Sequence, residues 1–140
     1  MDFKYELTVI PVSDVDRAKE FYAERLGFNV DGDHGMSDDF RVVQLTPPGS
    51  AASITIGKGI PQAEPGSYVG MHLVVDDVVA AREELVGRGV EVSEPFHFGP
   101  EGQTEGVDPE RGSYNSFASL TDPDGNVWLI QEVTERSPGR

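Results

Sequence analysis

The sequence predicts an α+β fold built from two tandem βαβββ modules whose curled mixed sheets surround a cleft. The closing segment Leu120–Val133 (LTDPDGNVWLIQEV) reads as a β-hairpin, and Leu45–Gly57 (LTPPGSAASITIG) is a weaker copy of it. Val12–Glu20 (VSDVDRAKE) likewise aligns with Val75–Glu83 (VDDVVAARE), so the start of a helix is also repeated. Because both the helix and the closing hairpin recur, a duplication explains the chain best.

The first module, about residues 1–57, begins with an alternating, β-prone segment, Lys4–Val12. Ser13 and Asp14 can cap the helix that follows, and Gly27 ends it. Its apolar stripe at helical spacing comprises Val15, Ala18, Phe21, Tyr22 and Leu26. Three further strands are predicted at Phe28–Asp31, Phe40–Leu45 and Ala52–Ile56, with an acidic, glycine-containing turn through Asp39 cutting the first of them short.

A linker rich in glycine and proline, residues 58–67, separates this module from the second, about residues 68–135. Strands are predicted at Val69–Val75, Val90–Phe98, Tyr114–Leu120 and Val127–Val133. Asp76 and Asp77 offer the cap of a second helix. We expect Trp128 and Phe21 to be core residues, because they lie on faces that should meet helices. Arg41 and Gln44 point to opposite faces of their strand, and the sequence does not decide which of them lines the cleft.

One long segment, Gly99–Ser113, shows no regular pattern and contains four glycines and two prolines. We interpret it as a flexible flap over the cleft, with Phe96, His97, Phe98 and Tyr114 at its hinges. A solvated loop without a functional role is the alternative interpretation.

Composition limits the functional classes. Hydrophobic residues make up 37% and charged residues 26% of the chain, which is typical of a folded domain. No membrane span or secretory leader is evident, and there is no cysteine, so we expect a cytoplasmic protein without disulfides or thiolate sites. The net charge of −14 argues against a nucleic-acid partner. It suits solubility, and it also permits attraction of a cationic small molecule.

The two modules, the opening V-S-D-V-D-R-A-K-E-F-Y-x-x-x-L-G-F and the D-P-D-G-N hairpin resemble the vicinal oxygen chelate superfamily, which includes glyoxalases, extradiol dioxygenases and bleomycin-resistance proteins. The resemblance implies a metal held by His and Glu side chains from the first and last strand of each module. Counting from the helix caps and the turn places these positions at Leu7, Ser53, Gly70 and Leu129. Such residues cannot hold a divalent metal, so we predict no metal and no cofactor.

Other residues remain as candidates for chemistry or binding. His72 shares a strand face with Gly70 and is the candidate ligand contact or general base, unless it is simply a packed neutral histidine. Gln131 shares a face with Leu129 and is predicted to bind ligand, together with Leu7, Leu129, His97, Phe98 and Tyr114. A metal site built from His72 and His97 is possible but lacks any supporting spacing.

Three functions are consistent with these residues. The first is a metal-independent protein of the bleomycin-resistance kind that binds a small organic molecule. The second is a lyase or isomerase in which His72 transfers a proton, and the third is a metal-dependent glyoxalase-like lyase with non-standard ligands. The resemblance also implies a homodimer.

Overall fold

The chain forms two units, each with one curled mixed sheet. The computed structural model describes residues 1–140 except for the side chain of Met36. Unit 1 comprises Met1–Tyr68 and Asp122–Asn126, and unit 2 comprises Val69–Thr121 and Val127–Arg140. The predicted α+β class and the two curled mixed sheets are confirmed.

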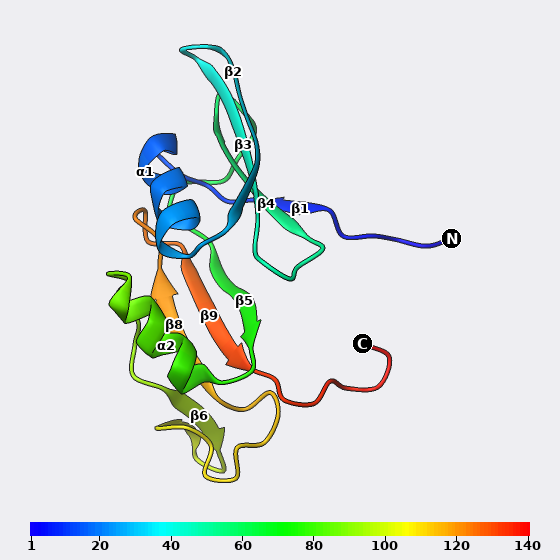
Figure 1. Cartoon of the computed structure of the whole chain (residues 1–140), viewed down its shortest axis with the longest axis vertical. Coiled ribbons are helices and arrows are strands. Elements are labelled where there is room, and N and C mark those ends of the chain that lie inside the picture. Colours follow the sequence, from blue (N-terminus) through cyan, green and yellow to red (C-terminus); the bar gives the residue numbers. More distant parts are fainter. The chain divides into compact units, whose positions relative to one another are not determined.

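Unit 1 holds a four-stranded sheet and one helical segment (Figure 1). Its sheet has the order β1-β4-β3-β2, in which β1 and β4 are parallel and the other pairs are antiparallel. Its elements are β1 (Leu7–Val9), α1 (Val15–Lys19), η1 (Glu20–Arg25), β2 (Asn29–Ser37), β3 (Phe40–Thr46) and β4 (Ser53–Lys58).

The predicted helix begins at its cap and ends in a wider turn. The Asp14 carboxylate accepts a hydrogen bond from the backbone N–H of Arg17 at 3.0 Å, as a helix N-cap does. From Glu20 onward the helix has π geometry, and the N–H of Leu26 donates to the carbonyl of Phe21 five residues earlier. Phe21 is buried, as predicted for a core residue.

The second strand is longer than the sequence predicts. The acidic segment 31–39 does not end it, because β2 continues to Ser37 and only Asp38 and Asp39 form the turn into β3. Two irregularities in the register between β2 and β3 accommodate the glycines that suggested a break.

The D-P-D-G-N turn is tied to unit 1 by buried polar contacts. The Asp122 carboxylate accepts hydrogen bonds from the Tyr22 hydroxyl at 2.7 Å and from the Asn126 side-chain amide at 2.8 Å. The same amide donates to the carbonyl of Pro11, and the Asn126 amide oxygen accepts from the N–H of Tyr68. The turn therefore has a structural role, because the side chains of Asp122 and Asn126 form buried hydrogen bonds within unit 1.

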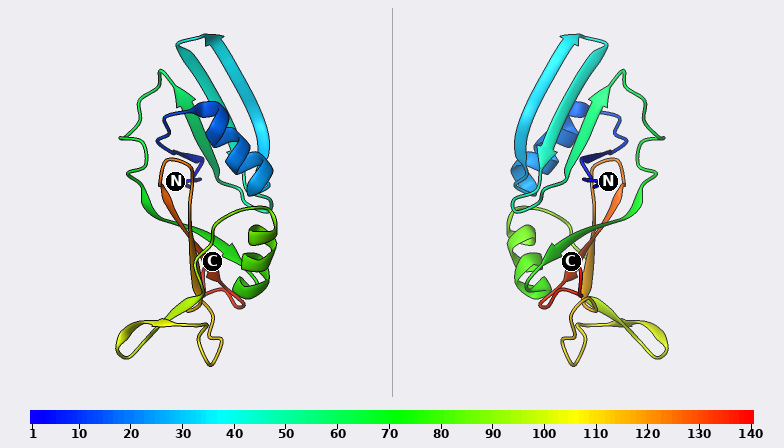
Figure 2. Two further views of the ribbon diagram at one scale, coloured as in Figure 1. Left: turned by 90° about the vertical axis from the view of Figure 1, so that its left-hand side faces the viewer. Right: turned by 90° about the vertical axis from the view of Figure 1, so that its right-hand side faces the viewer.

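Unit 2 holds a five-stranded sheet of order β5-β9-β8-β6-β7 and a second helix (Figure 2). β5 runs parallel to β9, and the remaining neighbours are antiparallel. Its elements are β5 (Val69–Val75), α2 (Val78–Gly87), β6 (Phe96–Gly99), β7 (Gly102–Glu105), β8 (Phe117–Thr121) and β9 (Val127–Glu132).

The region 90–113 differs from the prediction. The expected strand Val90–Phe98 is reduced to an isolated bridge between Val92 and Leu120 and to the short β6. The segment Gly99–Ser113 is not irregular throughout, because β7 pairs with β6 as a hairpin. Beyond β7, the Asp108 carboxylate accepts a hydrogen bond from the N–H of Gly112 at 2.8 Å. This bond is the main cause that lowers the pKa of Asp108. The segment therefore contains a hairpin and a hydrogen-bonded turn where the sequence predicted no regular structure.

Within the described residues, no helix is both long enough and apolar enough to cross a membrane.

Candidate functional site

The sheet of unit 2 has one face against α2 and one open face. Glu132 marks the helix side, because its carboxylate accepts a hydrogen bond from the N–H of Val78, the first residue of α2. Trp128 and Ile130 alternate with Glu132 along β9 and are equally buried, so they face α2 as well. Leu129 and Gln131 point the other way and are half-buried. They mark the open face.

His72 lies on this open face, directly opposite Leu129 in the parallel pair β5–β9. In unit 1, Leu7 lies opposite Ser53 in the equivalent pair β1–β4. Counting back from the helix cap placed Gly70 at the position equivalent to Leu7. The register instead places His72 there, because His72 lies only five positions before the cap Asp77, whereas Leu7 lies seven positions before the cap Asp14.

The hydrogen bonding of His72 fixes how its imidazole can act. Nδ1 lies 2.6 Å from the carbonyl oxygen of Gly70, which can only accept. Nδ1 therefore carries the proton, and the neutral ring has an unprotonated Nε2. Since the side chain is exposed, Nε2 is the atom of His72 suited to accept a hydrogen bond or a proton from a ligand.

Three phenylalanines form a cluster on the same face. Phe96 is paired with Phe117, and their rings are stacked with centroids 5.5 Å apart and planes 14° apart. Phe98 stands edge-on to Phe117 at 5.5 Å and is 51% exposed. His72 meets the same Phe117 ring edge-on at 6.4 Å. Phe117 itself is buried, so Phe96 and the half-exposed Phe98 supply the accessible aromatic surface of the open face, beside the imidazole.

A hollow of about 650 Å³ lies at the edge of this aromatic surface. Phe96 and Ser119 line it from the open face, and Gln103 and Glu105 line it from β7. Its volume is within the range of small-molecule sites. Its polar atoms are suited to a ligand that donates hydrogen bonds, and Glu105 adds negative charge.

Gln131 and Tyr114 are linked to each other. The Gln131 side-chain amide donates a hydrogen bond to the backbone carbonyl of Tyr114 at 2.9 Å. The Tyr114 hydroxyl accepts from the N–H of Ser137, which is the main cause that lowers the pKa of that hydroxyl. Tyr114 therefore contacts the C-terminal segment, and the side chain of Gln131 is held by the backbone of Tyr114 through its amide nitrogen.

His97 lies on the opposite face of the sheet from His72. It alternates with Phe96 and Phe98 along β6, is buried, and has Nδ1 2.7 Å from the carbonyl oxygen of Gly106. A metal site shared by His72 and His97 is therefore excluded by the alternation of the strands. The contacts of His97 hold the β6–β7 hairpin.

The open face of unit 1 carries both apolar and polar side chains. Leu7 and Val9 share it with Ser53 and Thr55, their partners in β4. Gln44 pairs with Thr55 and so points to the same face, which answers the question that the sequence left open. Arg41 points to the helix side.

The positions implied by the resemblance do not fit a metal. The observed register of β5 and β9 replaces Gly70 by His72 among the four positions that the resemblance implies. These positions are then Leu7, Ser53, His72 and Leu129. One imidazole and one hydroxyl are too few donors for a protein zinc or iron site. Within the part of the chain that the structure describes, no group of three or more His, Asp or Glu side chains is placed to hold a metal ion.

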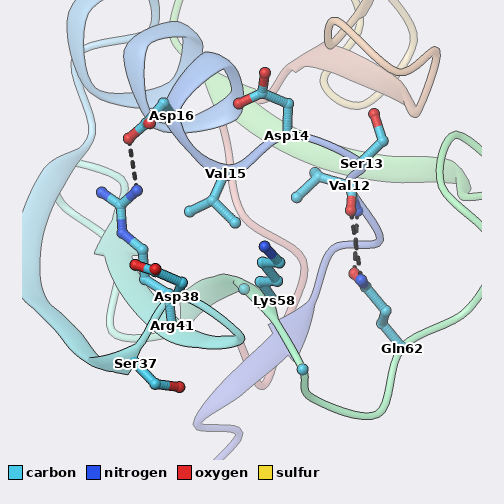
Figure 3. Close-up of a pocket in the computed structure, with 12 residues that line it drawn as sticks. Val12, Ser13, Asp14, Val15, Asp16, Ser37, Asp38, Arg41, Lys58 and Gln62 are labelled. Atoms are coloured by element: carbon cyan, nitrogen blue, oxygen red, sulfur yellow. Dashed lines mark hydrogen bonds and ion pairs between the residues drawn. The ribbon is translucent and has the colours of Figure 1, made fainter.

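A second cavity, of about 530 Å³, lies on the helix side of unit 1 (Figure 3). The ammonium group of Lys58 points into it, and Asp14, Asp16 and Asp38 stand around it. Arg41 at its wall donates hydrogen bonds to Asp16 and Asp33, which hold the pKa of the guanidinium above its usual range. Its wall contains the Arg41–Asp16 ion pair, is more polar than apolar and has no aromatic side chain, so we favour the open face of unit 2 as the ligand site.

Sequence reasoning missed one buried ion pair on the helix side of unit 2. The Arg111 guanidinium donates two hydrogen bonds to the Glu132 carboxylate, from Nε at 3.0 Å and from an Nη at 2.5 Å. The Glu132 side chain is 1% exposed, and Arg111 is the main cause that lowers its pKa. Alternation along β9 predicts that Glu132 points away from Gln131, towards the helix side. No local sequence pattern predicts that its partner is Arg111, because Arg111 lies in an irregular segment 21 residues earlier.

One unit of four strands and one of five, each with a helical segment on one face of its sheet and the other face open, define the fold class. Comparison with known proteins identifies the family. The model of the Glyoxalase/Bleomycin resistance protein/Dioxygenase superfamily matches residues 4–130, and the chain belongs to that superfamily.

Solved structures similar to this chain include two from Streptomyces sp. CB03234. A glyoxalase/bleomycin resistance protein is 33% identical, with a TM-score of 0.69, and the match covers 92% of this chain and 100% of that one. The antibiotic-binding protein TnmS3 is 32% identical, with a TM-score of 0.73 and coverages of 94% and 97%. The uncharacterized protein YetH of Bacillus subtilis (strain 168) is 24% identical over 122 residues, which are 86% of this chain and 91% of YetH.

Proposed function

We propose that this protein binds a small organic molecule with a planar aromatic part on the open face of unit 2. The observation that carries the proposal is the cluster of Phe96, Phe98 and Phe117 beside His72, next to a hollow of about 650 Å³. Aromatic rings bind planar ligands by offset stacking and by edge-to-face contacts. TnmS3, which is 32% identical to this chain, is an antibiotic-binding protein, which supports a small organic molecule as the ligand.

Polar groups around the cluster define the rest of the ligand. Gln131 and Nε2 of His72 accept hydrogen bonds, and Glu105 carries a negative charge. A ligand with hydroxyl or amine donors beside its planar part complements these groups, and the net charge of −14 favours a cationic one. We further propose that binding needs no metal and that the protein is a homodimer.

Titration calorimetry with a panel of planar aromatic antibiotics, half of them carrying an amine, tests the proposal. We expect micromolar binding of at least one member, with amine-bearing members preferred and no change after treatment with a chelator. Phe98→Ala should weaken binding tenfold or more, because a half-exposed ring contributes stacking without being essential to the core. Val86→Ala, at a 46% exposed position of α2, is the matched control and should bind normally. Equal loss in both variants, or binding that chelation abolishes, would contradict the proposal.

An acid–base reaction at His72 is the second candidate function. The observation in its favour is the hydrogen bond from Nδ1 to Gly70, which leaves Nε2 unprotonated and exposed beside the aromatic surface. Whatever ligand the panel identifies should then be tested for conversion by mass spectrometry. Loss of turnover with retained binding in His72→Gln would support this function. Unchanged ligand after prolonged incubation with the wild-type protein would leave binding as the only activity.

A further inference from the structure

Phe98, the most exposed ring of the aromatic surface, lies where the backbone pairing of β6 with β8 has already ended. Among the described residues, that pairing consists of Phe96 with Phe117. On the outer side of β6, Phe98 pairs with Gln103 of β7. Its N–H and carbonyl on the inner side still need partners, because a strand residue is held in place by hydrogen bonds to its backbone. The position of the Phe98 ring therefore depends on what replaces β8 there.

The Asn115 side chain takes the place of the missing strand partner. The N–H of Phe98 donates to Oδ1 of Asn115 at 3.1 Å, and Nδ2 of Asn115 donates to the carbonyl of Phe98 at 3.0 Å. Continuing the register of Phe96 and Phe117 by two residues sets Phe98 opposite Asn115. A carboxamide offers the same donor and acceptor as a peptide group. The side chain therefore extends the ladder between β6 and β8 by one pair.

The neighbours of the Asn115 amide fix its orientation. Nδ2 faces two acceptors, the carbonyl of Phe98 and the carboxylate of Asp108. The pKa of Asp108 is lowered mainly by the N–H of Gly112 and further by the Asn115 side chain. Oδ1 faces a donor, the N–H of Phe98. The flipped amide would set donor against donor and acceptor against acceptor, so only the observed orientation bonds both backbone groups of Phe98.

A strained turn presents Asn115 to β6. The N–H of Asn115 donates to the carbonyl of Gly112, which closes a turn with Tyr114 as its second central residue. Tyr114 has a φ of 74°, in the left-handed region where such turns favour glycine. Its N–H donates to the carbonyl of Glu132 at 2.9 Å, and its carbonyl accepts from the Gln131 side chain at 2.9 Å. These bonds hold the tyrosine in a conformation that costs free energy, as is common beside functional groups.

We propose that Asn115 is a positioning residue that fixes the Phe98 ring for stacking on the ligand, and this rests on the proposed binding function. Asn115 acts through the backbone of Phe98, without contact to the ligand. The same turn holds the Gln131 side chain, so it fixes one aromatic and one polar group of the open face together. Without the Asn115 amide, the end of β6 occupies the binding position for only part of the time. The apparent affinity then falls in proportion to that fraction.

Fluorescence titration with proflavine, a planar aromatic cation, tests the effect on binding. Asn115→Ala should raise the Kd about fivefold, less than Phe98→Ala does, because the ring is still present. Gln62→Ala is the matched control: the Gln62 side chain also accepts from and donates to one backbone residue, Val12 of unit 1, at 3.1 and 3.4 Å. This control should bind proflavine like the wild type, even if urea unfolding shows an equal loss of stability in both variants. Equal weakening in both variants would overturn the positioning role.

Hydrogen exchange measured by NMR tests the support of Phe98 without any ligand. The N–H of Phe98 should exchange about tenfold faster in Asn115→Ala, because its acceptor is lost. Asn115→Asp keeps that acceptor and the size of the side chain, so it should fold. It sets a carboxylate against the carbonyl of Phe98, so it should still raise the Kd for proflavine about threefold.

The outcomes separate this proposal from the proposed function. Unchanged exchange at Phe98 in Asn115→Ala would overturn the positioning role. Proflavine binding that is equally tight in the wild type, Asn115→Ala and Asn115→Asp would overturn that role alone and leave the aromatic surface as the ligand site. If the wild type binds neither proflavine nor any member of the antibiotic panel, the proposed function fails, and the role of Asn115 in binding fails with it.

Discussion

Replacing Arg111 by methionine tests whether the ion pair with Glu132 holds the helix side of unit 2. Glu132 is 1% exposed and receives two hydrogen bonds from Arg111 and one from the N–H of Val78. The substitution keeps much of the side-chain length but leaves a buried carboxylate with a single donor. An uncompensated buried charge costs several kcal/mol, so the free energy of unfolding should fall substantially.

The magnitude follows from the exposure of the two partners. Breaking a fully buried ion pair costs about 3–5 kcal/mol. The Arg111 side chain is 43% exposed, so water already weakens the pair and can partly solvate Glu132 once Arg111 is removed. We therefore expect a loss of about 2–3 kcal/mol at pH 7, measured by urea unfolding, and a melting point lower by roughly 8 °C. Arg88→Met, which removes an exposed pair with Glu84, is the control and should cost about 0.5 kcal/mol or less.

The pH dependence of this loss has a definite sign. Hydrogen bonds from Arg111 lower the pKa of Glu132 in the folded protein relative to its ordinary value of about 4.3. A carboxyl whose pKa is lowered by folding stabilises the protein fully above its ordinary pKa, and that stabilisation disappears as the pH falls through the lowered value. Without Arg111, burial raises the pKa of Glu132 in the folded variant, so the difference between wild type and Arg111→Met should be largest at pH 7–8 and shrink as the pH falls through that raised value towards the lowered value of the wild type.

A double-mutant cycle isolates the pair from the cap. Glu132→Gln retains an acceptor for the N–H of Val78 but removes the charge, so adding Arg111→Met to it should cost less than about 1 kcal/mol. The reasoning fails if Arg111→Met costs less than about 1 kcal/mol at pH 7, or if its cost at pH 3.5 equals that at pH 7.

Three further predictions concern the turn, one glycine and metal addition. Tyr22→Phe removes the buried hydrogen bond to Asp122, so urea unfolding should show a loss of about 1–2 kcal/mol in unit 1. Gly66→Ala should lower the free energy of unfolding by about 2 kcal/mol more than Gly49→Ala. Both glycines have positive φ, but only at Gly66 would the new Cβ clash with a backbone oxygen, the carbonyl of Asp124. Equal losses would show that φ alone decides. Zinc, nickel, manganese or iron should leave the thermal midpoint unchanged, and a rise of several degrees with stoichiometric metal in elemental analysis would show that His72 has partners we have not assigned.

The repeated architecture could be read from the sequence because its signals are local. A capping aspartate followed by an apolar stripe and a D-P-D-G-N turn followed by alternating residues each depend on neighbours within a few positions. The same locality explains the errors. The glycines and acids of 31–37 resemble a turn, but pairing with β3 keeps them in a strand. The glycine-rich segment 99–113 resembles a loop, but its hairpin and the bonds to Asp108 order it.

The candidate site was only half accessible to sequence reasoning. Alternation placed His72 on the open face, and a strand count placed Gln131 with Leu129. The same alternation separates His97 from His72, but only once the strand containing His97 is paired with its neighbours. The aromatic surface of Phe96, Phe98 and Phe117 joins two strands about 20 residues apart, and its stacking depends on their register.

The sequence by itself determined the class of this protein: an α+β chain of the Glyoxalase/Bleomycin resistance protein/Dioxygenase superfamily, indicated by its repeated helix cap and closing hairpin. Tertiary structure alone decided which residues meet. The pairing of β5 with β9 set His72 rather than Gly70 opposite Leu129, because the segment from this strand position to the helix cap is two residues shorter than in unit 1. Long-range contacts paired Arg111 with Glu132 and Tyr22 with Asp122. The physical reason is that local propensities depend on adjacent residues, whereas register and buried polar partners depend on how distant segments of the chain pack together.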